Sequence, residues 1–283
     1  MSVAVALVVE TVRMSCPYVA CALAAVVTER AGVINVALEG ALVVSGLATA
    51  VGALLSGSAL VGLVAGVAAG AALCAGHGVA VVRGRADAIV SSIAWNLIAF
   101  ALARYVLRVL WGTASSSPRV AGFAAPASPP LATLTSPARL ATALAAGAVA
   151  WMFARTRFGL RADAAGEAPE AARAQGVDVA RVQLVAATVA GALAALGGAH
   201  LVLDQHRFEV GMSGGRGFLA LAAVLVGRHR VGPTALAAVG LAGLDAAQIA
   251  LPAAVKLPPE LVLAVPYVAA LVIVAVAARR QRA

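Results

Sequence analysis

Three polar side chains stand inside strongly apolar stretches, and they are the first candidates for chemistry. Asn35 and Glu39 belong to "TERAGVINVALEG" (residues 28–40), and Asn96 lies in the middle of "SSIAWNLIAF". A charge at the centre of a bilayer costs about 2.5–3.5 kcal/mol on insertion scales, so polar groups kept there usually face a cavity or a partner. Because Asn35 and Glu39 are four residues apart, we predict that they share one face of a helix.

A Gly-rich stretch, "GMSGGRGF" (residues 211–218), adds Ser213 and Arg216 to these candidates. Unwound backbone at membrane depth is tolerated only where it is buried or lines a cavity. The apolar run that follows, 218–226, is too short to cross a membrane alone. We therefore predict a broken helix that presents Ser213 and Arg216 toward a hydrophilic path, in preference to an external turn.

The candidates for lining a solute path are thus Asn35, Glu39, Asn96, Ser213 and Arg216. For the three residues outside the Gly-rich stretch, interhelical hydrogen bonding is an equally weighted explanation, worth about 0.6 kcal/mol per contact. For Asp245 and Gln248, in "GLDAAQI", a structural role is favoured over a solute contact.

Metal and catalytic chemistry find little support in the sequence. The four histidines are scattered singly without ligand spacing, and Cys16, Cys21 and Cys74 stand in apolar context as buried, inert thiols. We expect no metal and no cofactor, and no Ser/His/Asp or Cys/His arrangement indicates an intramembrane enzyme. The net charge of +9 comes almost entirely from Arg. No basic patch with interleaved aromatic residues predicts nucleic-acid binding.

The composition predicts the elements that must position these residues. Hydrophobic residues make up 62% and charged residues 12% of the 283 positions, against roughly 25% charged residues in soluble domains. We predict an all-α, polytopic membrane helical bundle in one domain, 1–283, with about eight crossings, ten at most, and one broken or re-entrant helix. The predicted spans are 4–27, 36–56, 58–82, 88–111, 138–154, 182–203, 231–251 and 261–278.

Arginine clusters predict the orientation in the cell inner or plasma membrane, because positive residues gather in cytoplasmic loops. The clusters are 83–85, 155–181, 228–230 and the C-terminal tail. The Pro/Ser-rich loop 112–137 and the "DQHRFE" stretch then face outside. Glu29 and Arg30 are expected near a membrane boundary, where charge costs little.

The cytoplasmic segment 155–181 contains residues that favour the start and the end of a short helix. Pro169 suits a first turn, Glu167 and Glu170 near the start favour the helix dipole, and Gly176 ends the helix after Arg173. We predict a small amphipathic helix that docks a cytoplasmic partner. An ordinary solvated loop is the alternative.

Four motifs occur in order: "ERAGVINVALEG", "ADAIVSSIAWNLIAF", "RTRFGLRADAAGEAPEAARAQGVDVARVQLVAATVAGALAALGGA" and "GMSGGRGFLALAAVLVGR". Together they resemble the permease subunit of ABC importers for simple sugars and nucleosides. The resemblance covers most of residues 28–250 and is strongest to the nucleoside permease branch. Branched-chain amino-acid permeases, which share the style of "ERAGVIN", are more distant relatives.

The resemblance implies partners and a coupling loop. It implies a second permease as a homo- or heterodimer, an ATPase subunit with two nucleotide-binding halves, and an extracytoplasmic substrate-binding lipoprotein. No GxxxxGK[ST] occurs here, so ATP chemistry belongs to another chain. The cytoplasmic loop 155–181 then couples to the ATPase. The matching positions are Gly166, Glu167, Pro169, Glu170, Ala171, Ala172, Arg173 and Gly176.

Two other functions remain as alternatives to a nucleoside or sugar permease. One is an ion-coupled secondary transporter with Glu39 and Asp245 as ion sites. The other is a branched-chain amino-acid ABC permease. The fuller set of motifs favours the nucleoside and sugar side.

Overall fold

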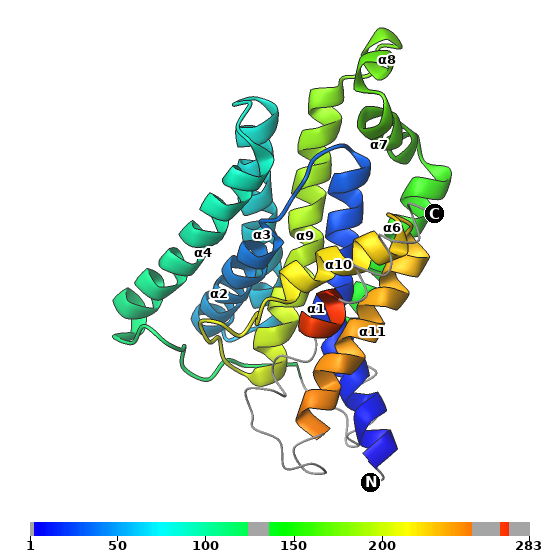
Figure 1. Ribbon diagram of the computed structural model, residues 1–283. Helices are drawn as coiled ribbons and strands as arrows, with labels where there is room; N and C mark the ends of the chain where they lie inside the picture. The colour runs from blue at the N-terminus through cyan, green and yellow to red at the C-terminus, as the bar shows by residue number, and fades with distance from the viewer. Residues whose placement is uncertain (1–2, 124–135, 251–266, 272–283) are drawn as a thin grey trace.

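Apolar runs bounded by charged, Pro and Gly residues become long helices in the computed structural model, which describes residues 3–123, 136–250 and 267–271 (Figure 1). The helices are α1 (Val3–Arg30), α2 (Leu38–Ser56), α3 (Ala59–Val82), α4 (Ala88–Trp111), α6 (Pro137–Arg155), α7 (Arg157–Glu167), α8 (Pro169–Ala174), α9 (Val179–Gln205), α10 (Arg216–Gly227) and α11 (Val231–Ala250).

The helical membrane bundle predicted from the sequence is confirmed. Among the described residues, six helices are long and apolar enough to cross a membrane: α1, α2, α3, α4, α6 and α9. Helix α11 matches the predicted span 231–251, whereas most of the predicted span 261–278 lies outside the described residues. Helix α10 has 12 residues, which rise about 18 Å against a hydrocarbon core of about 30 Å. It therefore covers only part of the membrane, as expected of a broken helix.

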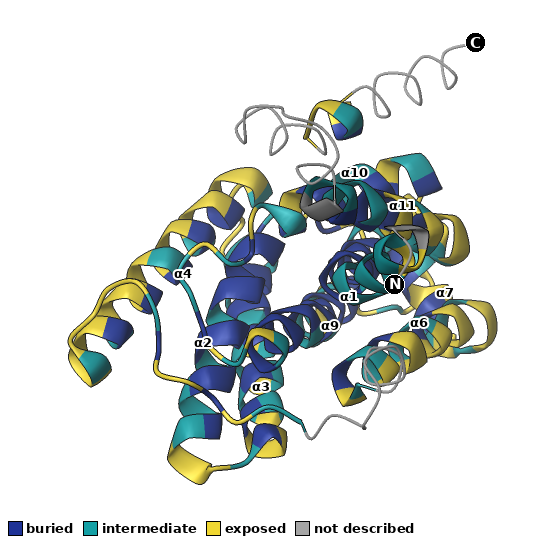
Figure 2. Ribbon diagram, turned by 90° about the horizontal axis from the view of Figure 1, so that it is seen from below, coloured by how far each residue is buried: buried dark blue, intermediate teal, exposed yellow. Residues whose placement is uncertain are grey.

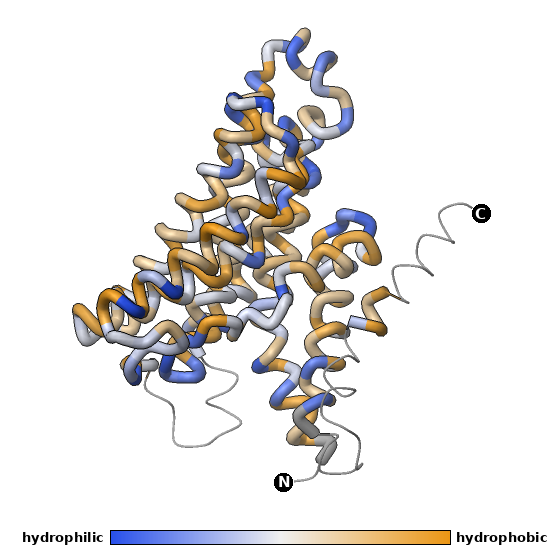
Figure 3. The backbone as a smooth tube through the Cα atoms, turned by 60° about the vertical axis from the view of Figure 1, so that its left-hand side comes forward, coloured by the Kyte–Doolittle hydropathy of each residue, from blue (hydrophilic) through white to orange (hydrophobic). Residues whose placement is uncertain are grey.

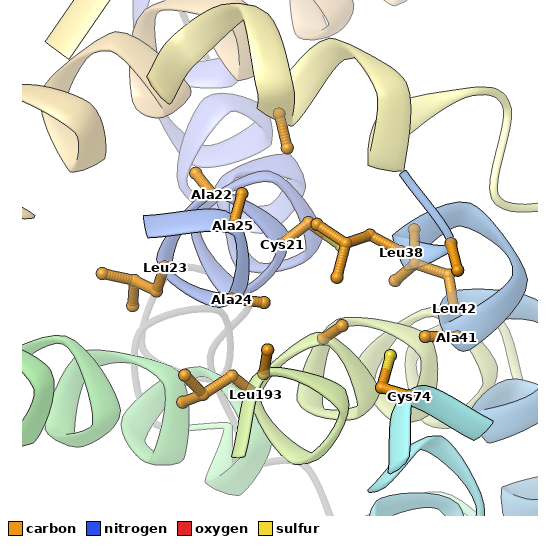
Figure 4. Packing of buried hydrophobic residues seen from close by; sticks show 14 of the residues in the cluster. Cys21, Ala22, Leu23, Ala24, Ala25, Leu38, Ala41, Leu42, Cys74 and Leu193 are labelled. Carbon is orange, nitrogen blue, oxygen red and sulfur yellow. The ribbon is translucent and has the colours of Figure 1, made fainter. Parts of the chain in front are cut away.

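The core lies around α9, which packs against α1, α2 and α3, while α11 packs along α1 (Figure 1). Figure 2 shows the buried residues concentrated on α1, α2 and α9, and exposed residues along α4. Small side chains dominate the contact between α1, α2, α3 and α9, with Ala24 facing Leu193 and Ala41 near Cys74 (Figure 4). Close van der Waals packing is the main force that joins helices in lipid. All three cysteines are free and buried, as predicted.

Glycines let α3 and α9 approach each other closely. A Cβ atom added at Gly191 would collide with the carbonyl oxygen of Gly70, and one at Gly70 would lie 2.8 Å from the carbonyl oxygen of Gly191. The two backbones therefore touch at this crossing, which any larger side chain would separate.

Three of the segments predicted to be cytoplasmic, all within the described residues, gather at one end of the bundle. Figure 1 shows the turn between α3 and α4, the connection from α1 to α2, and helices α7 and α8 at the same end. Figure 3 shows hydrophilic residues concentrated around α7 and α8, whereas the long helices are mainly hydrophobic. Helix α4 exposes a broad apolar face suited to lipid or a partner helix. The exposed residues include Ile89, Val90, Ile93, Leu97, Ile98 and Leu102.

Candidate functional site

The segment that joins α1 to α2, residues 28–40, is called the connector below. Gly32 has φ +79° and forms the turn that ends α1, where Val33 N–H donates to Thr28 O at 2.9 Å. Residues 33–36 are irregular, and α2 begins at Leu38. Before α2 starts, the connector buries Val33 and Asn35 and exposes Gly32 and Ile34.

The prediction that Asn35 and Glu39 share a helical face is wrong. Asn35 precedes α2, and its Oδ1 accepts a hydrogen bond from Ala37 N–H at 3.0 Å. Asn side chains commonly bond to the backbone two residues ahead, which competes with helix formation. Asn35 is fully buried, and its Nδ2 donates to Cys74 Sγ at 3.6 Å. It shapes the entry into α2.

Asn96 links α4 to the connector by two hydrogen bonds. Its Oδ1 accepts from Gly40 N–H at 2.8 Å and its Nδ2 donates to Val36 O at 3.1 Å. The first N–H groups of a helix lack partners inside the helix, so Asn96 satisfies one of them for α2. Gly40 is required here, because a Cβ atom at that position would lie 2.8 Å from Asn96 Oδ1.

Glu39 joins α2 to the start of α10. Its Oε1 accepts from Gly215 N–H at 2.9 Å and its Oε2 from Gly217 N–H at 2.8 Å. The side chain is almost fully buried, at 2% exposure. A carboxylate at a helix N-terminus satisfies free N–H groups and complements the helix dipole. Glu39 therefore holds the short helix α10 in the interior of the bundle.

Ser213 and Arg216 also lie at the start of α10, and they differ in whether their polar atoms have partners. Arg216 is paired with Asp245 of α11, with Nε and Nη2 donating to Oδ2 at 2.9 and 2.8 Å. Its Nη1 donates to Met212 O at 2.8 Å. Ser213 is buried, and its Oγ has no hydrogen-bond partner among the described residues. The sequence missed the pairing of Arg216 with Asp245, although it favoured a structural role for Asp245.

All five candidate residues thus surround two helix starts that lie side by side, those of α2 and α10. Four of the five use their polar atoms within the protein, whereas the buried Ser213 hydroxyl has no hydrogen-bond partner among the described residues. The arrangement is chemically a buried polar belt rather than a catalytic centre. No group of three or more potential metal ligands exists within the described part of the chain.

The cytoplasmic segment is folded. Residues 157–167, which the sequence placed in a hydrophilic segment, form α7, capped by Thr156 Oγ1, which accepts from Gly159 N–H at 3.1 Å. Glu167 is the last residue of α7, so its predicted place at the start of the short helix is wrong. A break at Ala168 separates the two helices, because Pro169 disfavours helical backbone in the residue before it.

Helix α8 has the predicted start and end. Pro169 occupies its first turn, and Gly176, at φ +80°, ends it with N–H donated to Arg173 O at 2.9 Å. Ala172 packs inward, whereas Glu170, Ala171 and Arg173 are exposed. A cavity of about 460 Å³ lies between α7, the segment that follows α8, and the start of α9. The short helix therefore projects from the bundle with charged and small residues outward.

Helix α7 is clamped to the connector by contacts that the sequence did not reveal. Arg30 Nε and Nη2 donate to the two carboxylate oxygens of Asp163 at 2.6 and 2.5 Å. The Arg30 guanidinium also stacks on Phe153, 3.8 Å from the ring centre. Gly32 and Gly166 bring the two backbones together, since a Cβ atom at Gly32 would lie 3.0 Å from Gly166 Cα. Gly166 thus has a packing role in addition to its place in the motif.

At the opposite end of the bundle, two segments predicted to face outside form a short ribbon. Residues 115–120 run antiparallel to 206–210, and Ser117 N–H donates to Phe208 O at 2.9 Å. Arg119 and Arg207 are exposed beside a cavity of about 530 Å³. Arg104 and Arg108, exposed on α4, line a second cavity of about 750 Å³ next to the ribbon. This end therefore presents several arginines on an ordered scaffold.

The fold and the site define a class of protein. Long apolar helices, a half-length helix anchored inside the bundle by Glu39, and a helix projecting among charged loops are the features of a multi-pass helical membrane protein. A family model described as "Branched-chain amino acid transport system / permease component" matches residues 7–276. The chain belongs to this family of ABC transporter permeases.

Three relatives represent the curated proteins that the chain resembles. It is 28% identical to the guanosine ABC transporter permease protein NupQ of Bacillus subtilis over 80% of this chain and 76% of the relative. It is 32% identical to the nucleoside ABC transporter permease protein NupC of Lactococcus lactis, over 76% and 73%. It is 30% identical to the putative glucose ABC transporter permease protein TsgC13 of Haloferax volcanii, over 88% and 78%. No solved structure matches the chain.

Family membership settles the broad role. The chain is a transport subunit rather than an enzyme, and it works in an ABC system with an ATPase and a substrate-binding protein. The resemblance found in the four sequence motifs is confirmed.

Proposed function

We propose that this chain forms, with a second permease chain, the path through which an ABC importer brings a nucleoside or a simple sugar into the cell. The observation that carries this proposal is the set of relatives named for guanosine, nucleosides and glucose, each aligned with three quarters or more of the chain. The family description names branched-chain amino acids, but the relatives lie on the nucleoside and sugar side.

The buried polar belt supports a path for a hydroxylated solute. The candidates remain Asn35, Glu39, Asn96, Ser213 and Arg216. Ser213 is the strongest candidate for direct solute contact, because its buried Oγ has no partner among the described residues. An unsatisfied hydroxyl in a dry interior costs free energy that a solute hydroxyl would recover. The other four position the helix starts around it.

The segment 155–181 docks the ATPase in this proposal, which assigns it an ATPase with two nucleotide-binding halves. The exposed side chains of α8, especially Glu170 and Arg173, make the contact. Support comes from the projection of α8 and from its ordered caps at Pro169 and Gly176. An ordered helix loses less conformational entropy on binding than a flexible loop.

The substrate-binding lipoprotein docks on the arginine-bearing ribbon at the other end. Positive charge in membrane proteins is usually concentrated in cytoplasmic loops, so arginines on the outer side favour a specific role there, such as binding an acidic partner. Arg119 and Arg104 would attract an acidic surface, whereas Arg207 is already paired with Glu209. A lipoprotein tethered to the membrane outside the cell could present such a surface.

Reconstitution tests the proposed function. The chain is placed in proteoliposomes with its second permease and ATPase, and the binding protein is added outside. We expect uptake of radiolabelled nucleosides or a simple sugar only when ATP and binding protein are both present. Uptake of leucine in preference to these solutes would overturn the solute class. Uptake by this chain alone, driven by a proton gradient, would overturn the proposal that ATP drives transport.

A further inference from the structure

The connector grips α10 at both of its ends. At the start of α10, Glu39 accepts the N–H groups of Gly215 and Gly217. At the far end, His229 lies in the turn after α10, and its Nε2 lies 2.6 Å from Glu29 Oε2. Glu29 and Glu39 both belong to the connector, so α10 is held by one short stretch of chain.

The same stretch is fastened to the cytoplasmic helix α7. The fork of Arg30 on the Asp163 carboxylate is bidentate, which fixes orientation as well as distance. The close approach of Gly32 and Gly166 brings the two backbones into direct contact. Both side chains of the ion pair are about three quarters buried, each with 26% exposure. Helix α7 is thus tied to the connector by a directed ion pair and by backbone contact.

Between these attachment points the connector is braced along its length. Val36 N–H donates to Ser92 Oγ at 3.0 Å, and His77 Nε2 lies 3.1 Å from Ile34 O. Gln183 Nε2 donates to Ala31 O at 3.2 Å. Because these bonds run to α4, α3 and α9, the connector is tied to the bundle as well as to α7, and these helices would share any displacement of it.

We propose that the connector transmits movement of the cytoplasmic helices to α10, with the Arg30–Asp163 pair as the input and the Glu29 and Glu39 contacts as the output. A displacement of α7 and α8 by the ATPase would carry the connector with it. Because the connector holds both ends of α10, this short helix would shift within the bundle and change the polar belt around Ser213. The inference rests on the proposed docking of the ATPase at α8.

The experiment compares Arg30→Ala, Asp163→Ala and the exchanged pair Arg30→Asp with Asp163→Arg in the complete importer. The matched control is Arg83→Ala, at an exposed arginine of the turn after α3. Three quantities are measured: the ATPase that copurifies, ATP hydrolysis, and solute taken up per ATP. We expect both single variants to retain the ATPase and hydrolyse ATP, with uptake per ATP about tenfold lower. The exchanged pair should regain most of the uptake, and Arg83→Ala should match the unaltered protein.

Unchanged uptake per ATP in either single variant would overturn the inference, and so would an exchanged pair that binds the ATPase but does not recover. If the single variants fail to accumulate in the membrane, the exchanged pair decides alone. Arg173→Glu, measured in parallel, tests the docking proposal separately. If that variant retains the ATPase and transports normally, docking at α8 is wrong, whatever the Arg30 variants show.

Discussion

At the scale of single residues, two membrane-embedded acids, Glu39 and Asp245, are held by donors from other elements. Glu39 faces two backbone N–H groups of α10, and Asp245 faces the guanidinium of Arg216. An acid used in this way is poorly placed to exchange ions with water, which weakens the secondary-transporter alternative. The cost of burying these charges is offset by complete pairing, as buried ionic groups require.

The pair of Arg216 and Asp245 allows a prediction about stability. Their side chains are only 14% and 17% exposed. Asp245→Asn leaves the arginine charge without its counter-ion, and breaking a buried pair costs about 3–5 kcal/mol. We expect a markedly lower midpoint of thermal unfolding in detergent. The double variant Arg216→Met with Asp245→Leu should recover most of the loss, since neither charge remains. A midpoint for Asp245→Asn equal to that of the unaltered protein would show that the pair contributes little.

At the scale of elements, close helix contacts depend on glycine at particular crossings. Gly191 lies against the backbone of α3, whereas Gly147 on α6 has no neighbour within 4 Å of an added Cβ atom. We expect Gly191→Ala to destabilise the protein by about 1–3 kcal/mol, because the helices must move apart. Gly147→Ala should instead be neutral or stabilise by about 0.5–1 kcal/mol through lower backbone entropy in the unfolded chain. Thermal unfolding of both purified variants checks this, and equal effects would contradict it.

Helix α8 is the element through which ATPase coupling can be tested directly. Its charged residues Glu170 and Arg173 are exposed, and α8 is attached to the rest of the chain mainly through Ala172. We expect Glu170→Arg and Arg173→Glu to abolish ATP-driven uptake while leaving the protein in the membrane, because only surface charge is altered. Western blotting of membranes controls for expression. Normal uptake by both variants would exclude α8 as the docking helix.

At the scale of the whole molecule, charge is distributed on two opposite ends with different proposed partners. Arg119 belongs to the outer ribbon, whereas Arg83 lies on the predicted cytoplasmic side. We expect Arg119→Glu to raise the concentration of binding protein needed for half-maximal ATPase stimulation by about tenfold at low salt. The effect should shrink at about 1 M salt, where the Debye length falls to about 3 Å. Arg83→Glu should leave this concentration unchanged; an equal effect of both variants would point to a loss of general stability.

Much of the fold follows from local sequence. The spans predicted as 58–82 and 88–111 are α3 (Ala59–Val82) and α4 (Ala88–Trp111) almost to the residue, because long apolar runs end where charges and glycine begin. Pro169 and Gly176 bound α8 for equally local reasons. The sequence did not reveal that Asn35 precedes α2. Its side chain accepts a hydrogen bond from the backbone two residues ahead, and α2 begins only at Leu38.

By itself, the sequence determined that the chain is a helical membrane protein, where long helices such as α3 and α4 begin and end, and which polar residues stand in apolar surroundings. Only the tertiary structure decided what those residues touch. Arg30 and Asp163 are 133 positions apart, and Glu39 and Gly217 are 178 apart. Helices built mainly from Ala, Val, Leu and Gly offer similar faces in many directions, so their sequences do not specify which polar groups will meet. The close packing of small residues around α9 settles these pairings.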